Sequence, residues 1–504
     1  MDNATLITFI VYLVGMLVIG VVGYRLTINL SDYVLGGRRL GPGVAALSAG
    51  ASDMSSWLIL GLPGAAYVLG FASAWICIGL SIGAYLNWQF VARRLRSYTE
   101  VANDSITVPD FLENRFRDTS KSLRVISAIV ILIFFTFYTS SGLVGGAKLF
   151  EASFNLSYTQ ALWIGAAVII SYTFLGGFLA VSWTDFLQGI LMILALIVVP
   201  IRAITEVGGW GEAVQAVGEV NPGALDIMSG ATFIGVVSLL AWGLGYFGQP
   251  HIITRFMALR STKDVPKARL IGMTWMVIGL FGAIFTGFAG IAYVANVSTA
   301  GMPFATEVSN GVTVLADSEQ IFIAFSQLLF DPWVAGILLA AILAAIMSTI
   351  DSQLLVSSSA VAEDFYKAVL RKKASDRELV WVGRLSVVAI ALLAIYLAYS
   401  AEATVLELVA YAWGGFGGAF GPIILFSLFW KRMTRNGALA GIIIGALTIF
   451  IWGNYLTGGP GGIFDLYEIV PAFILNSIAI VVFSLLDKEP SPEIQEEFDR
   501  AKTI

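Results

Sequence analysis

Long apolar runs separated by short polar segments divide the chain. A membrane-spanning α-helix needs about 20 mostly apolar residues, whereas a strand of a transmembrane barrel shows only about ten residues of alternating polarity. The runs here are continuous, so they predict helices. We expect thirteen spans, at 5–24, 43–70, 73–92, 125–147, 158–180, 184–205, 232–254, 270–295, 321–360, 380–399, 404–430, 436–457 and 466–486.

The second run is interrupted by a polar cluster near its middle. It contains Ser48, Ser52, Asp53, Ser55 and Ser56, flanked by glycines and prolines between positions 41 and 64. A charged residue at the centre of a span costs about 2.5 to 3.5 kcal/mol on insertion scales, so Asp53 is expected to face a polar interior or an ion. The flanking residues favour local unwinding of the helix, which exposes backbone carbonyls.

A second interrupted run lies five spans later, at 232–255, where Gly243, Gly245, Gly248 and Pro250 break the pattern. Five is odd, so the second set of five spans must run with inverted topology. Paired interruptions in two inverted repeats point to a binding site at the membrane midplane. We therefore expect an extra span at 5–24, inverted repeats at 43–205 and 232–430, two extra spans at 436–486 and a frayed cytoplasmic tail at 487–504.

The charges set an expected orientation. Lys and Arg gather in alternate connections, and such residues favour cytoplasmic loops, which predicts an external N-terminus and a cytoplasmic C-terminus. The composition, with 58% hydrophobic and 12% charged residues among 504 and a mean hydropathy of +0.84, excludes a soluble protein. The single Cys77 and the single His251 argue against disulfides and against cysteine or histidine metal clusters. The start MDNAT has no basic region, so the first run is expected to be retained.

Small and hydroxyl-bearing residues form a stripe in the ninth run. Ala345, Ser348, Thr349 and Ser352 have the spacing i, i+3, i+4, i+7 of one helix face. The stripe either packs helices closely or supplies oxygen ligands to Na⁺, together with carbonyls freed at Ala51 and Met54.

Three aspartates in the spans have open roles. Asp53 is expected to ligate the ion, to shape its approach by charge, or to accept hydrogen bonds from the broken helix. Asp351 lies off the hydroxyl stripe and is interpreted as a supporting or gating residue. Asp185 begins the sixth span and either caps that helix or takes part in gating.

Aromatic residues lie near both interruptions, namely Trp57, Tyr138, Trp242 and Tyr246. They are away from the interfaces where such rings usually anchor spans, so they are interpreted as walls for a substrate, with core packing as the alternative. His251 is expected to be a packed residue. No Lys or Arg is placed at midplane depth, which favours a zwitterionic substrate over one with net charge.

Four segments, GGRRLGPGVAALSAGASDMSSW, GGFLAVSWTDFLQ, WGLGYFGQPHIITRFMA and ILAAIMSTIDSQLL, closely resemble the sodium:solute symporter family over almost the whole chain. The resemblance implies an all-α polytopic membrane protein of the LeuT-like 5+5 inverted-repeat fold with two broken helices, located in the bacterial cytoplasmic membrane. It implies an alternating-access carrier that couples inward sodium flow to uptake of L-proline. The implied sodium site comprises Ala51, Met54, Ala345, Ser348 and Thr349, and the family's important aspartate matches Asp53, which we add to the candidate sodium site. For proline the resemblance implies Ser55, Trp57, Gly61, Tyr138, Trp242, Tyr246 and Pro250. It matches Arg38 to the family's basic residue before the helix, and the residues themselves add Asp185 and Asp351 as gating candidates.

The neighbouring Arg39 leaves open which arginine carries the coupling role. Sodium is the expected coupling ion, and neither another cofactor nor a nucleic-acid partner is expected. The protein is expected to act as a monomer in the lipid bilayer. An enzyme would need a nucleophile with its base or a metal motif such as HExxH, which the sequence lacks. A receptor would need an output domain. The remaining alternative is a sodium-coupled carrier of pantothenate, a sugar or another osmolyte.

Overall fold

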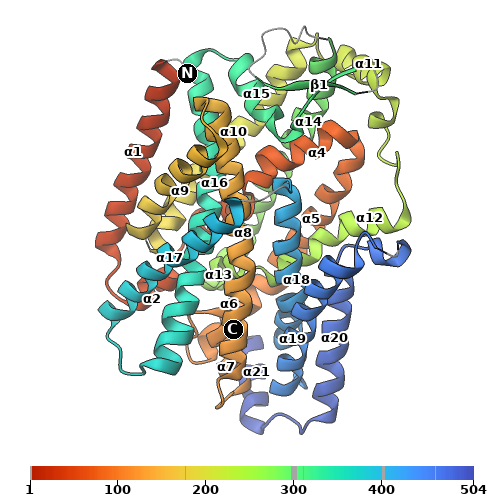
Figure 1. The fold of residues 1–504 in the computed structure, drawn as a ribbon. Coiled ribbons are helices and arrows are strands. Elements are labelled where there is room, and N and C mark those ends of the chain that lie inside the picture. Colours follow the sequence, from red (N-terminus) through yellow and green to blue (C-terminus); the bar gives the residue numbers. More distant parts are fainter. Residues whose placement is uncertain are drawn as a thin grey trace.

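The computed structural model describes residues 3–175, 177–296, 304–309, 312–399, 403–459 and 461–503, which form a bundle of long helices (Figure 1). The long helices are α1 Asn3–Leu26, α5 Ala74–Leu86, α8 Ser122–Phe154, α9 Tyr158–Leu175, α10 Phe178–Glu206, α14 Val265–Asn296, α16 Pro332–Ser359, α17 Asp376–Tyr399, α18 Val405–Phe429, α19 Arg435–Ile451 and α20 Ile469–Leu486. Shorter helices connect them: α2 Leu30–Leu35, α6 Ala92–Val101, α7 Val108–Phe116, α11 Trp210–Val220, α15 Ile321–Leu328 and α21 Pro492–Thr503.

Within the described part of the chain, ten helices are long and apolar enough to cross a membrane, or eleven if one bent pair counts as a span. The protein is therefore a multi-pass membrane protein, as predicted. The number of these helices differs from the thirteen predicted spans for two reasons. The apolar part of α9 is short, and 57–101 counts as one helical stretch although a positive φ of 61° at Gly70 separates α4 (Leu62–Leu69) from α5.

Two segments are interrupted where glycine and proline cluster. Helix α3 (Pro42–Asp53) ends at Met54, and helical structure resumes as a π-helix, η2 (Trp57–Gly61), followed by α4. Helix α12 (Phe233–Leu240) continues as a 3₁₀-helix, η6 (Ala241–Gly248), and then as α13 (Pro250–Met257), with a bend of 44° before α13. Proline has no N–H and glycine stabilises helices poorly, which explains both interruptions.

Glycine also allows η6 of the second interrupted segment to approach α5 closely. A Cβ on Gly83 of α5 would lie 2.1 Å from the carbonyl oxygen of Gly243 in η6, so only hydrogen fits there. Asn87 follows at the end of the same helix and donates to the carbonyl of Tyr246 at 2.9 Å. This close backbone approach fixes η6 against α5.

The structure corrects three expectations. The predicted span 321–360 is two helices, because Asp331 caps a new helix start by accepting from the N–H groups of Trp333 and Val334. Helix α16 then continues as a π-helix, η9 (Ala360–Leu370). The fold also contains an antiparallel hairpin of β1 (Thr306–Ser309) and β2 (Val312–Leu315), so it is not purely helical.

The third correction concerns the tail, which is a docked helix and not a frayed segment. Phe498 of α21 is only 1% exposed and meets the ring of Tyr98 edge-on at 6.0 Å. The guanidinium groups of Arg94 and Arg115 lie 5.1 and 5.2 Å from its ring centre. An aromatic side chain between cations is stabilised by burial and by cation–π attraction.

Candidate functional site

The end of α3 gathers polar groups around one backbone carbonyl. The carbonyl oxygen of Asp53 accepts from Trp57 Nε1 at 3.0 Å, from the Tyr138 hydroxyl at 3.4 Å and from the N–H of Ser55 at 3.0 Å. Ser55 Oγ in turn accepts from the N–H of Trp57 at 3.3 Å. The unwound turn is thus held by side chains in place of helical hydrogen bonds.

The predicted hydroxyl stripe of α16 faces α3 directly. Ser348 Oγ donates to the carbonyl oxygens of Ala51 at 2.8 Å and Ala345 at 3.2 Å. Thr349 Oγ1 lies 3.3 Å from both of these oxygens. Two carbonyl and two hydroxyl oxygens from two helices therefore converge, which is a set of ligands that a hard cation accepts.

Met54 is fully buried just after α3, and its N–H donates to the carbonyl of Gly50 at 2.8 Å. Ser352, the fourth residue of the stripe, donates instead to Asp351 Oδ1 at 3.3 Å and accepts from Arg255 at 2.5 Å. The stripe is thus divided between two polar clusters.

The carboxylate of Asp53 points to the other interrupted segment. Its Oδ2 accepts a hydrogen bond of 2.5 Å from the Tyr246 hydroxyl, while Oδ1 is buried without a partner among the described residues. Asp53 therefore connects α3 to η6 and does not cap its own helix. Tyr246 was predicted only as a substrate wall.

A small cavity lies beside this pair. Its volume is about 20 Å³, and Asp53, Tyr246, Asn87, Met54 and Met276 are among its lining residues. Asn87 Oδ1 is also buried and has no partner within the described ranges. The cavity has room for one water molecule or small ion. Sequence reasoning missed Asn87; an amide inside an apolar span was the available signal.

Aromatic rings from four segments form one cluster. Trp242 lies 6.1 Å from Trp57, 6.4 Å from Trp413 and 5.8 Å from Tyr467, measured between ring centres. Tyr246 meets Trp413 edge-on at 5.1 Å. The structure brings together Trp57, Trp242 and Tyr246 as predicted neighbours, whereas Trp413 and Tyr467 were missed because they lie more than 150 residues away along the chain.

The other predicted substrate residues lie around this cluster at different distances. Tyr138 meets His251 edge-on at 6.0 Å, and both nitrogens of His251 are buried without a hydrogen-bond partner in the described part of the chain. Pro250 begins α13. Gly61 lies away from the rings, since a Cβ there would meet Leu406 at 3.1 Å and Glu319 at 3.5 Å. Its surroundings are those of a packing residue.

Asp185 forms a fully buried ion pair that the sequence did not predict. Its Oδ2 lies 3.1 Å from Arg255 Nη2 and accepts from Ser48 Oγ at 2.7 Å, and both charged side chains have no exposed surface. Helix α10 begins at Phe178, so the interpretation of Asp185 as a helix cap is wrong. Arg255, which ends the second interrupted run, is thus buried, and Asp185 neutralises its charge.

The two pre-helix arginines differ in their contacts. Arg38 binds Asp104 at 2.9 Å and donates to the carbonyl oxygens of Met257 and Ser105, each at 2.8 Å. Arg39 is 60% exposed and pairs locally with Asp32. Arg38 is therefore the arginine that ties the start of α3 to the end of α13.

The chain is similar in sequence to several bacterial proline transporters. It is 54% identical to a sodium/proline symporter of Escherichia coli over 496 residues, covering 98% of this chain and 96% of the relative. It is 52% identical to the high-affinity proline transporter PutP of Bacillus subtilis over 485 residues, covering 96% and 98%. It is 50% identical to the osmoregulated proline transporter OpuE of the same organism over 491 residues, covering 97% and 96%.

Solved structures resemble the fold. A Na⁺-coupled sialic acid symporter in a substrate-bound, outward-open state matches with a TM-score of 0.79 at 19% identity, covering 97% of this chain and 99% of that one. MhsT in complex with L-phenylalanine matches with a TM-score of 0.52 at 15% identity, covering 88% and 97%. These likenesses concern the fold alone, which is that of LeuT-like transporters.

The model of the sodium:solute symporter family matches residues 33–445. Together with the full-length relatives, this match confirms the prediction of a transporter and not an enzyme. The chain belongs to the sodium:solute symporter family.

Proposed function

We propose that this protein couples the inward flow of sodium to the uptake of L-proline by alternating access. The observation that carries the proposal is the convergence of Ala51, Ala345, Ser348 and Thr349 oxygens beside Asp53, whose carboxylate contacts the aromatic cluster through Tyr246. The names of relatives at about half identity support proline over pantothenate, sugars or other osmolytes.

The sodium ion binds the carbonyl oxygens of Ala51, Met54 and Ala345 and the hydroxyls of Ser348 and Thr349. Asp53 contributes its negative charge close by. The proton on each hydroxyl now points to a carbonyl, and rotation about the Cβ–Oγ bond frees the lone pairs for the ion. No covalent step is involved.

Proline binds between the two interrupted segments as a zwitterion. Its carboxylate takes N–H groups at the start of a half-helix such as α13, where the helix dipole favours negative charge. Its ammonium donates to freed carbonyls or to Ser55. Trp57, Trp242, Tyr246 and Tyr138 enclose the pyrrolidine ring, which loses no rotamer entropy on binding.

The driving force is sufficient. A membrane potential of about 100 mV contributes about 2.3 kcal/mol for each charge, and a tenfold sodium gradient adds about 1.4 kcal/mol. One sodium ion per proline thus supports accumulation of about 500-fold.

The proposed topology has thirteen spans, with an external N-terminus, a cytoplasmic C-terminus, inverted repeats at 43–205 and 232–430, and a location in the bacterial cytoplasmic membrane. The two termini lie toward opposite ends of the bundle, which supports an odd number of spans (Figure 1). We place Arg38, Asp185 and Asp351 in coupling and gating.

The test is uptake of labelled L-proline into proteoliposomes containing the full chain. An inward sodium gradient should drive accumulation, and a proton gradient in sodium-free buffer should not. A hundredfold excess of D-proline, glycine, pantothenate or glucose should compete less well than unlabelled L-proline. Uptake driven by protons alone would refute sodium coupling, and stronger competition by pantothenate or glucose would refute the substrate.

A further inference from the structure

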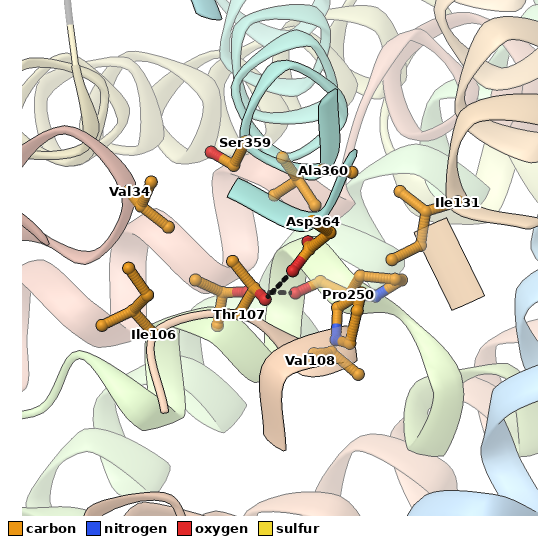
Figure 2. A pocket seen from close by; sticks show the side chains of 12 residues that line it. Val34, Ile106, Thr107, Val108, Ile131, Pro250, Ser359, Ala360 and Asp364 are labelled. Atoms are coloured by element: carbon orange, nitrogen blue, oxygen red, sulfur yellow. Dashed lines mark hydrogen bonds between the residues drawn. The ribbon is translucent and has the colours of Figure 1, made fainter. Parts of the chain in front are cut away.

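A second small cavity lies beside Pro250 and is lined mostly by apolar side chains, with a few polar ones among them (Figure 2). Its volume is about 10 Å³, which is close to what one water molecule or small cation needs. Thr107, Thr254, Ser359 and Asp364 contribute polar atoms to its lining. The cavity thus adjoins a proposed substrate residue but is separate from the proposed sodium ligands.

Asp364 has one carboxylate oxygen without a partner. Its Oδ1 accepts from Thr107 Oγ1 at 3.0 Å and from Arg124 Nε at 2.8 Å. Its Oδ2 is buried and has no hydrogen-bond partner among the described residues, and the side chain has no exposed surface. A buried carboxylate oxygen without a hydrogen-bond donor is destabilised, and a bound cation would compensate for this.

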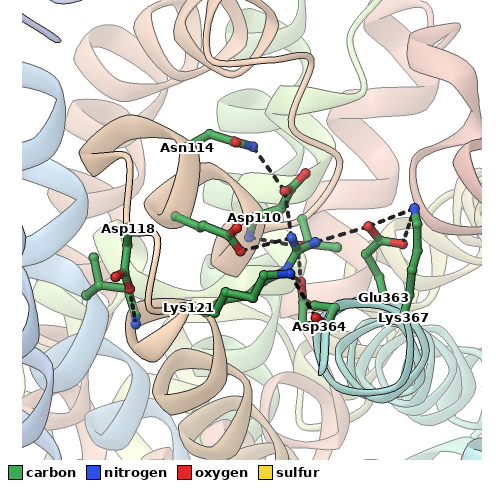
Figure 3. A network of polar contacts seen from close by, with 12 residues as sticks. Asp110, Asn114, Asp118, Lys121, Glu363, Asp364 and Lys367 are labelled. Carbon is green, nitrogen blue, oxygen red and sulfur yellow. Dashed lines mark hydrogen bonds and ion pairs between the residues drawn. The ribbon is translucent and has the colours of Figure 1, made fainter. Parts of the chain in front are cut away.

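The charges around Asp364 do not balance. Arg124 binds four carboxylates, those of Asp110 at 3.2 Å, Glu113 at 3.0 Å, Glu363 at 3.0 Å and Asp364 at 2.8 Å (Figure 3). Lys367 pairs with Glu363, whereas Lys121 donates to the carbonyl of Ala368. Four carboxylates against the three cations Arg124, Lys367 and Lys121 leave an excess of one negative charge, which attracts a further cation.

The same helix that carries the proposed sodium ligands leads to this cavity. Beyond Ser352, the residues Val356, Ser359, Ala360 and Asp364 all line it. The first three follow at i+4, i+7 and i+8, on the face of the hydroxyl stripe. The wider winding of the π-helix η9 keeps Asp364 on the side of Ala360. Of these four, only Ser359 and Asp364 carry side-chain oxygens, so two polar side chains connect the end of the sodium stripe to the Arg124 cluster.

We propose that this cavity is a transient sodium site on the release path to the cytoplasm, with Asp364 Oδ2 as its charged ligand and the hydroxyls of Thr107, Thr254 and Ser359 around it. The inference rests on the proposed sodium coupling. Within the described residues no three acidic, histidine or cysteine side chains are arranged to hold a metal ion. One carboxylate with hydroxyls binds a monovalent ion weakly, as a site of passage requires.

The test uses thiol labelling in inside-out vesicles of the full-length protein. Cys77→Ser removes the single native thiol, and Val356→Cys places a partly exposed reporter at the cavity without removing a proposed ligand. Ser348→Ala with Thr349→Ala disables the main site, so that ion effects transmitted from it are removed. In this background, sodium should slow labelling by N-ethylmaleimide relative to equal potassium. Adding Asp364→Asn should abolish the protection.

The matched control is Glu113→Gln, which removes another carboxylate from Arg124 but does not line the cavity, and it should keep the protection. Thr107→Val keeps the charge of Asp364 but removes one proposed hydroxyl ligand, so it should weaken the protection by sodium. This variant tests the proposed site even if Asp364→Asn does not fold. Equal labelling in sodium and potassium, or protection unchanged by Asp364→Asn or by Thr107→Val, would overturn the proposal. Protection by L-proline without sodium would assign the cavity to the substrate's ammonium and refute the sodium site.

The two proposals fail in different ways. Suppose first that the sodium site at Ser348 and Thr349 is wrong. Sodium should then protect the reporter through Asp364 with or without Ser348→Ala and Thr349→Ala, and these two changes should leave the sodium dependence of uptake unchanged. If the release site is wrong, the protection disappears with the disabled stripe, while those two changes still weaken sodium-driven uptake.

Discussion

Tyr246 and Asp53 join the two interrupted segments through a single hydrogen bond of 2.5 Å between the phenol and Oδ2. Both side chains are buried, at 3% and 2% exposure. The carboxylate lies two residues after the Ala51 carbonyl that meets the hydroxyl stripe, and the phenol ring packs on Trp413. Each of the two proposed ligand sites thus has one end of the same hydrogen bond, so we expect sodium binding and proline binding to be coupled through it.

Tyr246→Phe should lower the affinity for both ligands, because it removes a hydrogen bond to a charged group, worth about 1.5 to 3 kcal/mol. Sodium-dependent proline binding at equilibrium measures both constants. Asp53→Asn should be more damaging than Asp53→Glu, since the glutamate keeps the charge. A Tyr246→Phe protein that loses proline affinity but keeps its sodium affinity would contradict the coupling.

Ser348→Ala and Thr349→Ala should each raise the sodium concentration that gives half-maximal uptake, because each removes one oxygen ligand. The apparent affinity for proline should therefore fall when sodium is limiting and recover when sodium is saturating. Ser358→Ala is the matched control, since that hydroxyl lies on the same helix and donates to the carbonyl of Leu355 at 2.9 Å. An unchanged sodium dependence in both variants would show that the stripe only packs helices.

Trp413→Ala should raise the proline concentration needed for half-maximal uptake more than the sodium concentration, as Trp242→Ala should. Its ring supports both Trp242 and Tyr246, and its Nε1 donates to the carbonyl of Trp242 at 2.7 Å. Trp163→Ala is the control, because that side chain is 49% exposed. Uptake kinetics of labelled proline make the comparison, and equal effects of Trp413→Ala and Trp163→Ala would refute the assignment.

Arg255→Met alone should destabilise the protein by about 3 to 5 kcal/mol, because it leaves the Asp185 carboxylate buried without its partner. Asp185→Leu alone should act similarly, and the double variant should recover most of the loss. Unfolding in detergent followed by tryptophan fluorescence measures this cycle. Additive losses in the double variant would mean that the pair contributes little as a pair.

Phe498→Ala should release α21 from α6, and limited proteolysis of the tail should become faster. Burial raises the pKa of Glu497 against the opposing effect of Arg117, Arg115 and Arg500. The docked tail therefore binds protons more readily than the free tail, so docking should weaken as pH rises through the range between the ordinary and the raised pKa. Glu497→Gln should remove this pH dependence. Cleavage at equal rates across that range in the unaltered chain would contradict it.

The sequence alone determined the membrane class, the position of the two interruptions and the hydroxyl stripe. Each depends on local physics. Apolar length decides whether a helix can cross a bilayer, proline and glycine decide where it breaks, and the 3.6-residue period decides which side chains share a face. Ser348 and Thr349 were therefore identifiable from the sequence as candidate partners for carbonyls freed near Ala51.

Only the tertiary structure decided which distant residues meet. Arg255 ends the second interrupted run, where an arginine is typical of a polar connection, yet it is buried against Asp185, 70 residues away in sequence. Trp413 and Tyr467 carry no local signal for a site, because an aromatic side chain in a span looks the same whether it packs or lines a cavity. The roles of Arg38 over Arg39, the docking of Phe498 and the unpaired oxygen of Asp364 likewise follow from helix packing, which brings together residues that no local pattern connects.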